Sequence, residues 1–423
     1  MQEFLLGAAT SAYQVEGNNV YSDFWLMEQA EHTSFKERSG DAVDHYNHYE
    51  EDIRLMKKAG MNAYRFSIEW ARIEPEKGRY NDGAIAHYRK VLECCHENGI
   101  TPVVTMHHFS SPVWLIRENG WENEKVVGYF RDYCVYVTAQ LGDIMEYVCT
   151  INEANMRLQV TSVMRTMLKN MGVNLQVGMN FELPEEYAVG EREISEILGG
   201  VKKANTFMAP CTPEGDLLIM EAHEAARDAM KAKCPHLKIG LTLSLHDIQP
   251  VTGGEQSAKE IWNEEFTHYL PYIQKDDFFG LQNYTRMLVN AEGELPVPDG
   301  KQCTQMGYEF YPEALEHVIR TVSKELELPI IVTENGVATL DDQERIEYLQ
   351  TALYGVKRCI DDNVPVIGYL HWSLFDNFEW QLGYSKKFGL IEVDRSMQER
   401  KPKESFYKMA AIWKTAHTRR DER

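Results

Sequence analysis

The sequence predicts an α/β protein folded as a (β/α)8 TIM barrel. Short apolar runs rich in β-branched residues recur along the 423 residues, and amphipathic helical patterns separate them. The runs that have strand character are residues 4–10, 62–68, 102–107, 147–152, 238–245, 278–284, 330–333 and 366–372. Eight alternations of strand and helix are typical of this barrel. The alternative is a doubly wound open sheet, but no run is followed by its G-x-G-x-x-G turn.

The segments between the runs have the 3.6-residue periodicity of helices that are buried on one side. Residues 49–60 carry such an apolar face and stop at a glycine, and residues 82–98 stop at Asn98-Gly99. The connection around 156–216 is longer than ordinary loops, so we expect it to form short helices or to cover the barrel mouth. No repeat or linker divides the chain, which predicts one domain over 1–423 with this long insertion.

Composition and the absence of targeting signals limit the partners and the cellular location that we expect. The chain has 44 Lys and Arg against 65 Asp and Glu, a net charge of −21, which argues against nucleic acid and anionic membranes as partners. The N-terminus has no basic segment before its short apolar run, and no span is long enough to cross a bilayer. The eight cysteines lack metal or disulfide spacing. We therefore expect a cytoplasmic protein with reduced thiols, and the sequence leaves a homo-oligomer open.

Two of the predicted strands close on a glutamate. The run at 330–333 ends at Glu334, directly before the break signal Asn335-Gly336, and the run at 147–152 ends at Glu153. A single glutamate at a strand end is more often a solvated rim residue. Two strand-end glutamates of one barrel, however, point into the same mouth, where barrel enzymes carry their chemistry.

Three motifs resemble those of the family 1 retaining β-glycosidases. Thr150-Ile151-Asn152-Glu153 is similar to the family's T-F/L-N-E motif, and residues 331–336 are similar to its I/V-T-E-N-G motif. Residues 371–390 are close to its W-S-L-x-D-N-F-E-W-x-x-G-Y-x-x-R/K-F-G-L block, which is the most specific of the three. The resemblance extends from Phe4 to about Lys408, and it implies a retaining mechanism on a (β/α)8 barrel.

The resemblance implies that Glu334 is the nucleophile and Glu153 the acid/base. Such enzymes need two carboxyl groups about 5 to 5.5 Å apart, one to attack the anomeric carbon and one to protonate the leaving oxygen. Burial and the neighbouring negative charge should then raise the pKa of Glu153. Once the glycosyl-enzyme has formed, Glu334 is no longer charged, and Glu153 can ionise and activate water.

Two further residues are implied to support the nucleophile. Arg65 lies in a segment similar to the family's Y-R-F-S-I-x-W motif and would hold Glu334 ionised; its alternative is a structural ion pair with Glu69. Tyr284 falls where the family has a tyrosine that hydrogen-bonds the nucleophile. Its alternative is a strand-end aromatic with its hydroxyl in water.

The same resemblance implies a set of substrate-binding residues. Asn152, beside the acid/base, would bond the sugar 2-hydroxyl, a contact that strengthens at the transition state. Trp380 would be the flat wall on which the ring lies. His107-His108 alone could indicate a metal, but adjacent strand residues face opposite ways and no third ligand is evident. The predicted set is Gln14, His108, Asn152, Trp372, Glu379, Trp380 and Phe388.

These residues together predict hydrolysis of terminal β-D-glucosyl residues, with galactosyl or fucosyl residues tolerated, from small β-glycosides or oligosaccharides. No metal or organic cofactor is expected. A 6-phospho-β-glycosidase is an alternative that Glu379 disfavours, because a carboxylate there would repel a phosphate. A transglycosidase and a catalytically silent sugar-binding relative are the others. Ala154 and Gln282-Asn283 depart from the family pattern, in which Pro and Asn-Tyr are more usual, and leave the aglycone preference open.

Overall fold

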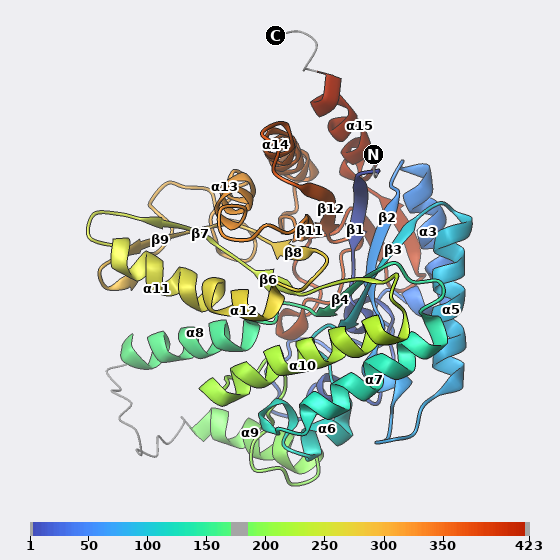
Figure 1. Cartoon of the computed structure of the whole chain (residues 1–423). Helices are drawn as coiled ribbons and strands as arrows, with labels where there is room; N and C mark the ends of the chain where they lie inside the picture. Colours follow the sequence, from blue (N-terminus) through green and yellow to red (C-terminus); the bar gives the residue numbers. More distant parts are fainter. Residues whose placement is uncertain (1–2, 171–184, 419–423) are drawn as a thin grey trace.

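A computed structural model describes residues 3–170 and 185–418, and it confirms the predicted (β/α)8 barrel (Figure 1). The strands of the barrel, all paired in parallel, are β1 (Leu5–Ala9), β2 (Ala63–Ser67), β3 (Thr101–His107), β4 (Tyr147–Ile151), β5 (Lys238–Gly240), β6 (Thr242–Ser244), β8 (Phe279–Gln282), β11 (Ile330–Asn335) and β12 (Val366–Trp372). The single strand predicted at 238–245 is therefore two pieces. β5 pairs with β4 and β6 pairs with β8, so this broken strand closes the barrel.

Helices surround the strands, and small sheets lie beside them. The longer helices are α3 (His45–Lys58), α5 (Asp82–Glu97), α7 (Val126–Leu141), α8 (Met156–Asn170), α9 (Glu185–Ile197), α10 (Pro213–Lys233), α11 (Glu255–Glu265), α13 (Ala314–Val322), α14 (Asp342–Asp361) and α15 (Glu404–Thr418). The short ones are α1 (Ala12–Val15), α2 (Asp23–Met27), α4 (Trp70–Ile73), α6 (Val113–Arg117), α12 (Leu270–Ile273), η1 (Gly120–Glu122), η2 (Thr267–Tyr269) and η3 (Trp380–Leu382). The remaining strands are β7 (Asp247–Pro250), β9 (Arg286–Asn290), β10 (Gly293–Glu294), β13 (Ile391–Asp394) and β14 (Glu399–Pro402). No helix in the described residues is long and apolar enough to span a membrane.

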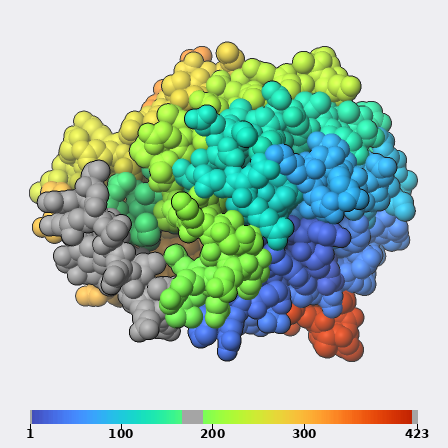
Figure 2. Space-filling view, turned by 90° about the horizontal axis from the view of Figure 1, so that it is seen from below, coloured from blue at the N-terminus to red at the C-terminus, as the bar shows by residue number. Residues whose placement is uncertain are grey.

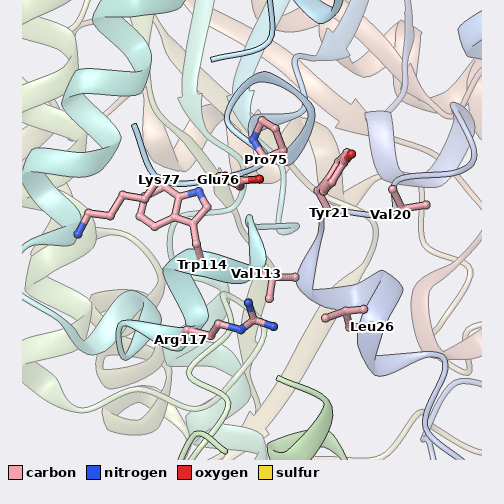
Figure 3. A pocket seen from close by; sticks show the side chains of 9 residues that line it. All are labelled: Val20, Tyr21, Leu26, Pro75, Glu76, Lys77, Val113, Trp114 and Arg117. Carbon is pink, nitrogen blue, oxygen red and sulfur yellow. The ribbon is translucent and has the colours of Figure 1, made fainter. Parts of the chain in front are cut away.

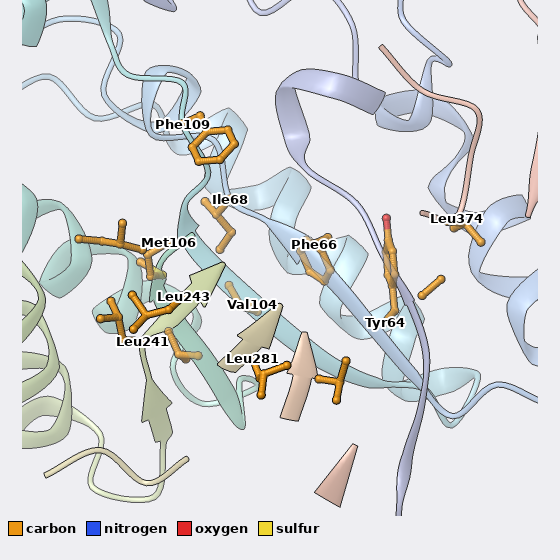
Figure 4. Packing of buried hydrophobic residues seen from close by; sticks show 14 of the residues in the cluster. Tyr64, Phe66, Ile68, Val104, Met106, Phe109, Leu241, Leu243, Leu281 and Leu374 are labelled. Carbon is orange, nitrogen blue, oxygen red and sulfur yellow. The ribbon is translucent and has the colours of Figure 1, made fainter. Parts of the chain in front are cut away.

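Alternate residues of each strand face two different cores. On β2, Tyr64 and Phe66 point outward and pack with Val104 and Met106 of β3 in the layer between strands and helices (Figure 4). Ala63, which precedes Tyr64, belongs to a smaller cluster inside the barrel. Arg65, two residues further along, is on the same inner face and is fully buried. The alternation thus sends a charged side chain into the barrel interior.

A β-bulge near the end of β11 changes which side chains face inward. Val332 pairs with Leu281 of β8, but the next pair is Glu334 with Gln282, so Thr333 is an extra residue on β11. Without it, Glu334 would share the outer face of Ile330 and Val332, which pack against the helices. The bulge turns the Glu334 carboxylate into the barrel.

The long connection contains helices, as expected. α8 and α9 lie in this connection and are followed by a stretch without helix at 198–212, whereas residues 171–184 lie outside the description. α9 is held to the loop after β1, because the backbone N–H and Nδ1 of His32 bond the Glu193 carboxylate at 2.9 and 2.6 Å. Seen from the lower end of Figure 1, the surface is hollowed between the green atoms of α8 and the yellow-green atoms of α9 (Figure 2).

Gly7 should be irreplaceable for packing β1 against β2. A Cβ at this position would lie 1.7 Å from the carbonyl oxygen of Ala63, which is backbone and cannot move aside. We expect Gly7→Ala to lower the free energy of unfolding by about 3 kcal/mol or more, measured by denaturant titration.

Gly128 in α7 gives the matched control. The nearest atom to a Cβ there is 4.0 Å away. Gly128→Ala should therefore raise stability by about 0.5–1 kcal/mol through helix propensity. Equal effects of the two substitutions would contradict the close approach of β1 and β2.

Candidate active site

The predicted site residues come from different parts of the chain and gather at the C-terminal ends of the barrel strands. Arg65 lies on β2, Glu153 follows β4, and Glu334 lies on β11. This is the end from which Figure 2 is seen and where α8 and α9 flank a hollow. The C-terminal face is where barrels of this type place their active sites.

The guanidinium of Arg65 joins four barrel strands. Its Nη1 donates to Glu334 Oε1 and its Nη2 to Asn152 Oδ1, both at 2.6 Å, while Nε donates to Thr105 Oγ1 at 3.0 Å. The side chain is fully buried. The alternative pairing with Glu69 is wrong, because a Glu69 oxygen instead accepts from Ser110 Oγ at 2.6 Å.

Glu334 has a second donor on its other oxygen. The Tyr284 hydroxyl donates to Glu334 Oε2 at 2.6 Å, so this hydroxyl is bonded to the carboxylate and the water-facing alternative is wrong. Burial raises the pKa of Glu334, and the Arg65 charge and the Tyr284 hydrogen bond act against that rise. These two donors stabilise the ionised form of Glu334.

Glu153 is placed by an unusual backbone conformation. Its φ is 42°, in the left-handed region, and two bonds to Thr242 hold the turn: Glu153 N–H to Oγ1 and Ala154 N–H to the carbonyl, both at 3.0 Å. Burial and then the negative charge of Glu334 raise the pKa of Glu153 to about 8, against a hydrogen bond from Ser244. Glu153 is therefore protonated at neutral pH while Glu334 has the partners to be ionised.

Gln14 and Glu379 form a hydrogen-bonded pair beside these two carboxyl groups. Gln14 Nε2 donates to Glu379 Oε2 at 3.3 Å and to the carbonyl of Phe378 at 2.7 Å, and Ser11 Oγ donates to Gln14 Oε1 at 2.7 Å. Burial and then the Glu334 charge raise the pKa of Glu379 to about 8. The interaction of Glu334 with both Glu153 and Glu379 indicates that the three carboxyl groups lie in one site.

The predicted aromatic residues pack against one another and against their neighbours. Trp380 stacks on Tyr13 with ring centroids 5.6 Å apart, and His108 lies parallel to both Trp372 (5.6 Å) and Trp380 (6.3 Å). Burial holds the pKa of His108 well below its usual range, so the ring is neutral. Phe388 meets the Tyr284 ring edge-on at 6.0 Å. Hydrogen bonds, ring contacts or charge interactions thus connect the predicted site residues into one cluster around Arg65, Glu153 and Glu334.

Several buried polar atoms in the cluster have no hydrogen-bond partner among the described residues. They include Asn152 Nδ2, His108 Nδ1 and Gln282 Oε1. A buried polar atom without a partner is unfavourable by about 1–3 kcal/mol. A ligand with hydroxyl groups would satisfy such atoms.

Comparison with known proteins assigns the family. The model described as glycosyl hydrolase family 1 matches residues 1–169 and 255–418. Beta-glucosidase A of Thermotoga maritima is 31% identical over 96% of this chain and 95% of its own length. The chain belongs to glycosyl hydrolase family 1. The resemblance predicted from the motifs is confirmed, and the protein is a glycoside hydrolase.

Other family 1 relatives match over the same extent. A bifunctional beta-D-glucosidase/beta-D-fucosidase of Bifidobacterium breve is 28% identical over 95% of each chain. The crystal structure of beta-glycosidase BGL167 has a TM-score of 0.87 at 44% identity, covering 99% of this chain and 97% of its own. The Thermotoga maritima beta-glucosidase in complex with deoxynojirimycin has a TM-score of 0.80 at 27% identity, covering 98% of each.

Several residues of this family 1 site were not predicted from the sequence. Thr242 and Ser244 on β6 contact Glu153, and Tyr308 lies near enough to Glu379 and Glu153 for their charges to raise its pKa further above the value that burial gives. Gln282 was noted only as a departure from the family pattern. Its side chain donates to Asn152, and no motif contains that information.

Outside the family 1 site, the described residues also form a cluster of possible cation ligands and several surface hollows. In the described part of the chain, the group of acidic and histidine side chains close enough to share an ion is Glu31, His32 and Glu193, and it is at the surface. A hollow of about 310 Å³ lies between α2 and α6 (Figure 3). Two of its charged residues are paired, Lys77 with Glu118 and Glu76 with Arg79. Neither feature belongs to the buried carboxyl cluster.

The raised pKa of Glu153 should make this residue destabilising at neutral pH. Between the ordinary carboxyl pKa of 4.5 and about 8, the unfolded chain releases the proton and the folded protein keeps it, so stability falls as pH rises. Glu153→Gln does not titrate, and its stability advantage over the wild type should grow by on the order of 2 kcal/mol from pH 5 to pH 8. Chemical denaturation at both pH values measures this.

The exposed Glu124 provides the control for that measurement. Glu124→Gln, measured under the same conditions, gives the effect of the same substitution at the surface. A Glu153→Gln advantage that is constant with pH would contradict the raised pKa.

Proposed function

We propose that this protein is a retaining β-glucosidase that hydrolyses terminal non-reducing β-D-glucosyl residues by double displacement. The observation that carries the proposal is the difference between two buried carboxyl groups. Glu334 is held by Arg65 and Tyr284, whereas Glu153 has a pKa raised to about 8. A retaining glycosidase needs this pair, one ionised carboxylate and one carboxylic acid. Relatives named beta-glucosidase support the choice of glycone.

In the first step, Glu334 attacks the anomeric carbon and forms a covalent glycosyl-enzyme. The Arg65 and Tyr284 donors fix the direction of the carboxylate, so one oxygen can approach the substrate without losing orientation. Glu153 gives its proton to the leaving oxygen at the same time. The burial that raises its pKa therefore supplies the proton at neutral pH.

In the second step, water releases the sugar. Glu334 is now an ester and carries no charge, so the repulsion that helped to hold Glu153 protonated is gone. Glu153 ionises and removes a proton from the attacking water. Attack from the side opposite to the ester restores the β configuration.

The remaining residues recognise the glycone. Asn152 Nδ2, which has no partner among the described residues, would donate to the 2-hydroxyl, and Gln14 and Glu379 would bond hydroxyls further from the reacting carbon. The parallel rings of Trp380 and Tyr13 would support the apolar face of the sugar ring. Glu379 would repel a 6-phosphate once ionised, which favours an unphosphorylated sugar.

We also propose that the substrates are small neutral β-glycosides met in the cytoplasm, and that fucosides are accepted. All eight cysteines are free thiols, and the net charge of −21 disfavours anionic ligands and polymers. A relative with both glucosidase and fucosidase activity in its name supports the second glycone.

Glu334→Gln should abolish hydrolysis of an aryl β-glucoside, with kcat reduced by more than about 10⁴-fold, because an amide cannot form the glycosyl ester. Initial rates with a chromogenic substrate measure this. Glu309→Gln is the matched control, since Glu309 is also a buried glutamate that binds an arginine, at 2.8 Å to Arg286. Retained activity in Glu334→Gln would end the proposal.

Glu153→Ala should slow release of the sugar most, because no base then activates water. We expect azide to restore turnover of substrates with good leaving groups and to give the β-configured glycosyl azide, identified by NMR. An α-configured azide would assign the opposite role to Glu153.

The wild-type kcat/KM should fall as pH rises through about 8, where Glu153 loses its proton. This decrease should be absent from the pH profile of Glu153→Ala.

A further inference from the structure

We propose that Gln282 is a positioning residue that aims the Asn152 amide at the sugar 2-hydroxyl and thereby sets how strongly the protein prefers ligands that have this hydroxyl. The inference rests on the proposed function, because it concerns the same glycone pocket. Gln282 is fully buried and ends β8, where it pairs with Glu334 across the bulge. Gln282 therefore lies beside the proposed nucleophile Glu334, but its side-chain amide bonds to Asn152, the residue that precedes the proposed acid/base.

The Gln282 side chain makes its hydrogen bonds through Nε2. Nε2 donates to Asn152 Oδ1 at 2.7 Å and to Thr242 Oγ1 at 3.4 Å. The oxygen Oε1 is buried without a partner among the residues that the structure covers. The opposite orientation of the amide would bring Oε1 against Asn152 Oδ1, and two acceptors repel. The donor of Gln282 must therefore face Asn152.

Asn152 Oδ1 consequently has two close donors, Gln282 Nε2 at 2.7 Å and Arg65 Nη2 at 2.6 Å. The Thr242 hydroxyl is farther away, at 3.5 Å, and lies closer to the carbonyl of Ile151, at 3.3 Å. A carbonyl oxygen accepts along two lone-pair directions that lie in the plane of its amide. One donor leaves the terminal torsion of an asparagine broad, whereas two donors fix the plane. Fixing the plane also fixes the direction of Nδ2, the buried atom left without a partner.

The arrangement depends on glutamine at this position. The family pattern has Asn-Tyr where this chain has Gln282-Asn283, and asparagine is shorter by one methylene. The Asn283 amide turns away and donates to the carbonyls of Leu245 and Thr285. Asn152 thus receives its second donor from the longer side chain of Gln282, and not from its neighbour.

The experiment compares two ligands that differ only at the 2-position, deoxynojirimycin and its 2-deoxy analogue, by calorimetric titration. In the wild type, deoxynojirimycin should bind more tightly. Gln282→Met keeps the length of the side chain and removes the donor, and it should reduce this preference about tenfold, the contribution of one hydrogen bond. Binding of the 2-deoxy analogue should stay within about twofold of the wild type. The same split should appear in kcat/KM for aryl glucoside against aryl 2-deoxyglucoside.

Three controls separate positioning from a general structural role. Gln249→Met replaces a half-buried glutamine of β7, outside the barrel, and should leave the preference unchanged. In an Asn152→Ala background, Gln282→Met should have no further effect on it. Gln282→Leu, a second variant without the donor, should repeat the loss. Thermal unfolding should show both Gln282 variants folded, because the substitution also removes an unsatisfied oxygen.

Equal weakening of both ligands by Gln282→Met, or an unchanged preference, would overturn the inference. So would a wild type that binds the two ligands equally or binds neither. The proposed function has a separate criterion: a wild type that binds deoxynojirimycin selectively but does not hydrolyse an aryl β-glucoside would contradict the function and leave the role of Gln282 standing.

Discussion

The buried guanidinium of Arg65 is the constraint on which the top of the barrel depends. A charge with no solvent exposure is unfavourable by several kcal/mol unless it is paired and its hydrogen-bond donors are satisfied. Arg65 meets this demand with Thr105, Asn152 and Glu334, which come from β3, the end of β4 and β11. The register of these strands must therefore bring the three acceptors around one guanidinium. The candidate active site lies at the same place.

The same cation favours one particular carboxylate of the pocket. Burial raises the pKa of all three carboxyl groups, Glu153, Glu334 and Glu379. Only Glu334 combines a bond to the guanidinium with a phenol hydroxyl on its other oxygen. The site accordingly favours one ionised carboxylate among the three. The other two carboxyl groups keep their protons at neutral pH, and holding these protons lowers the free energy of unfolding.

Sequence patterns predicted the barrel, and the family resemblance supplied the candidate site residues, but neither could reveal three features of the structure. Alternation alone would put Glu334 on the outer face with Val332, and only the register of β11 with β8 reveals the extra residue Thr333. The break at Leu241 that divides the fifth strand depends on pairing with two different neighbours. The contact between Gln282 and Asn152 joins residues 130 positions apart. Each of these is a relation between strands, and propensity and periodicity describe one strand at a time.

The backbone accounts for the different roles that we propose for the two glutamates. The residue type is the same, and both strands end in the same mouth. Glu334 sits on a bulge that places it between Arg65 and Tyr284, whereas Glu153 sits in a left-handed turn anchored on Thr242, with Ser244 as its hydrogen-bond partner. The bulge gives the Glu334 carboxylate two strong donors. The left-handed turn places the Glu153 carboxyl group in a buried position beside a negative charge. Two local departures from ideal strand geometry thus give the proposed acid and the proposed nucleophile different surroundings, although both are glutamates.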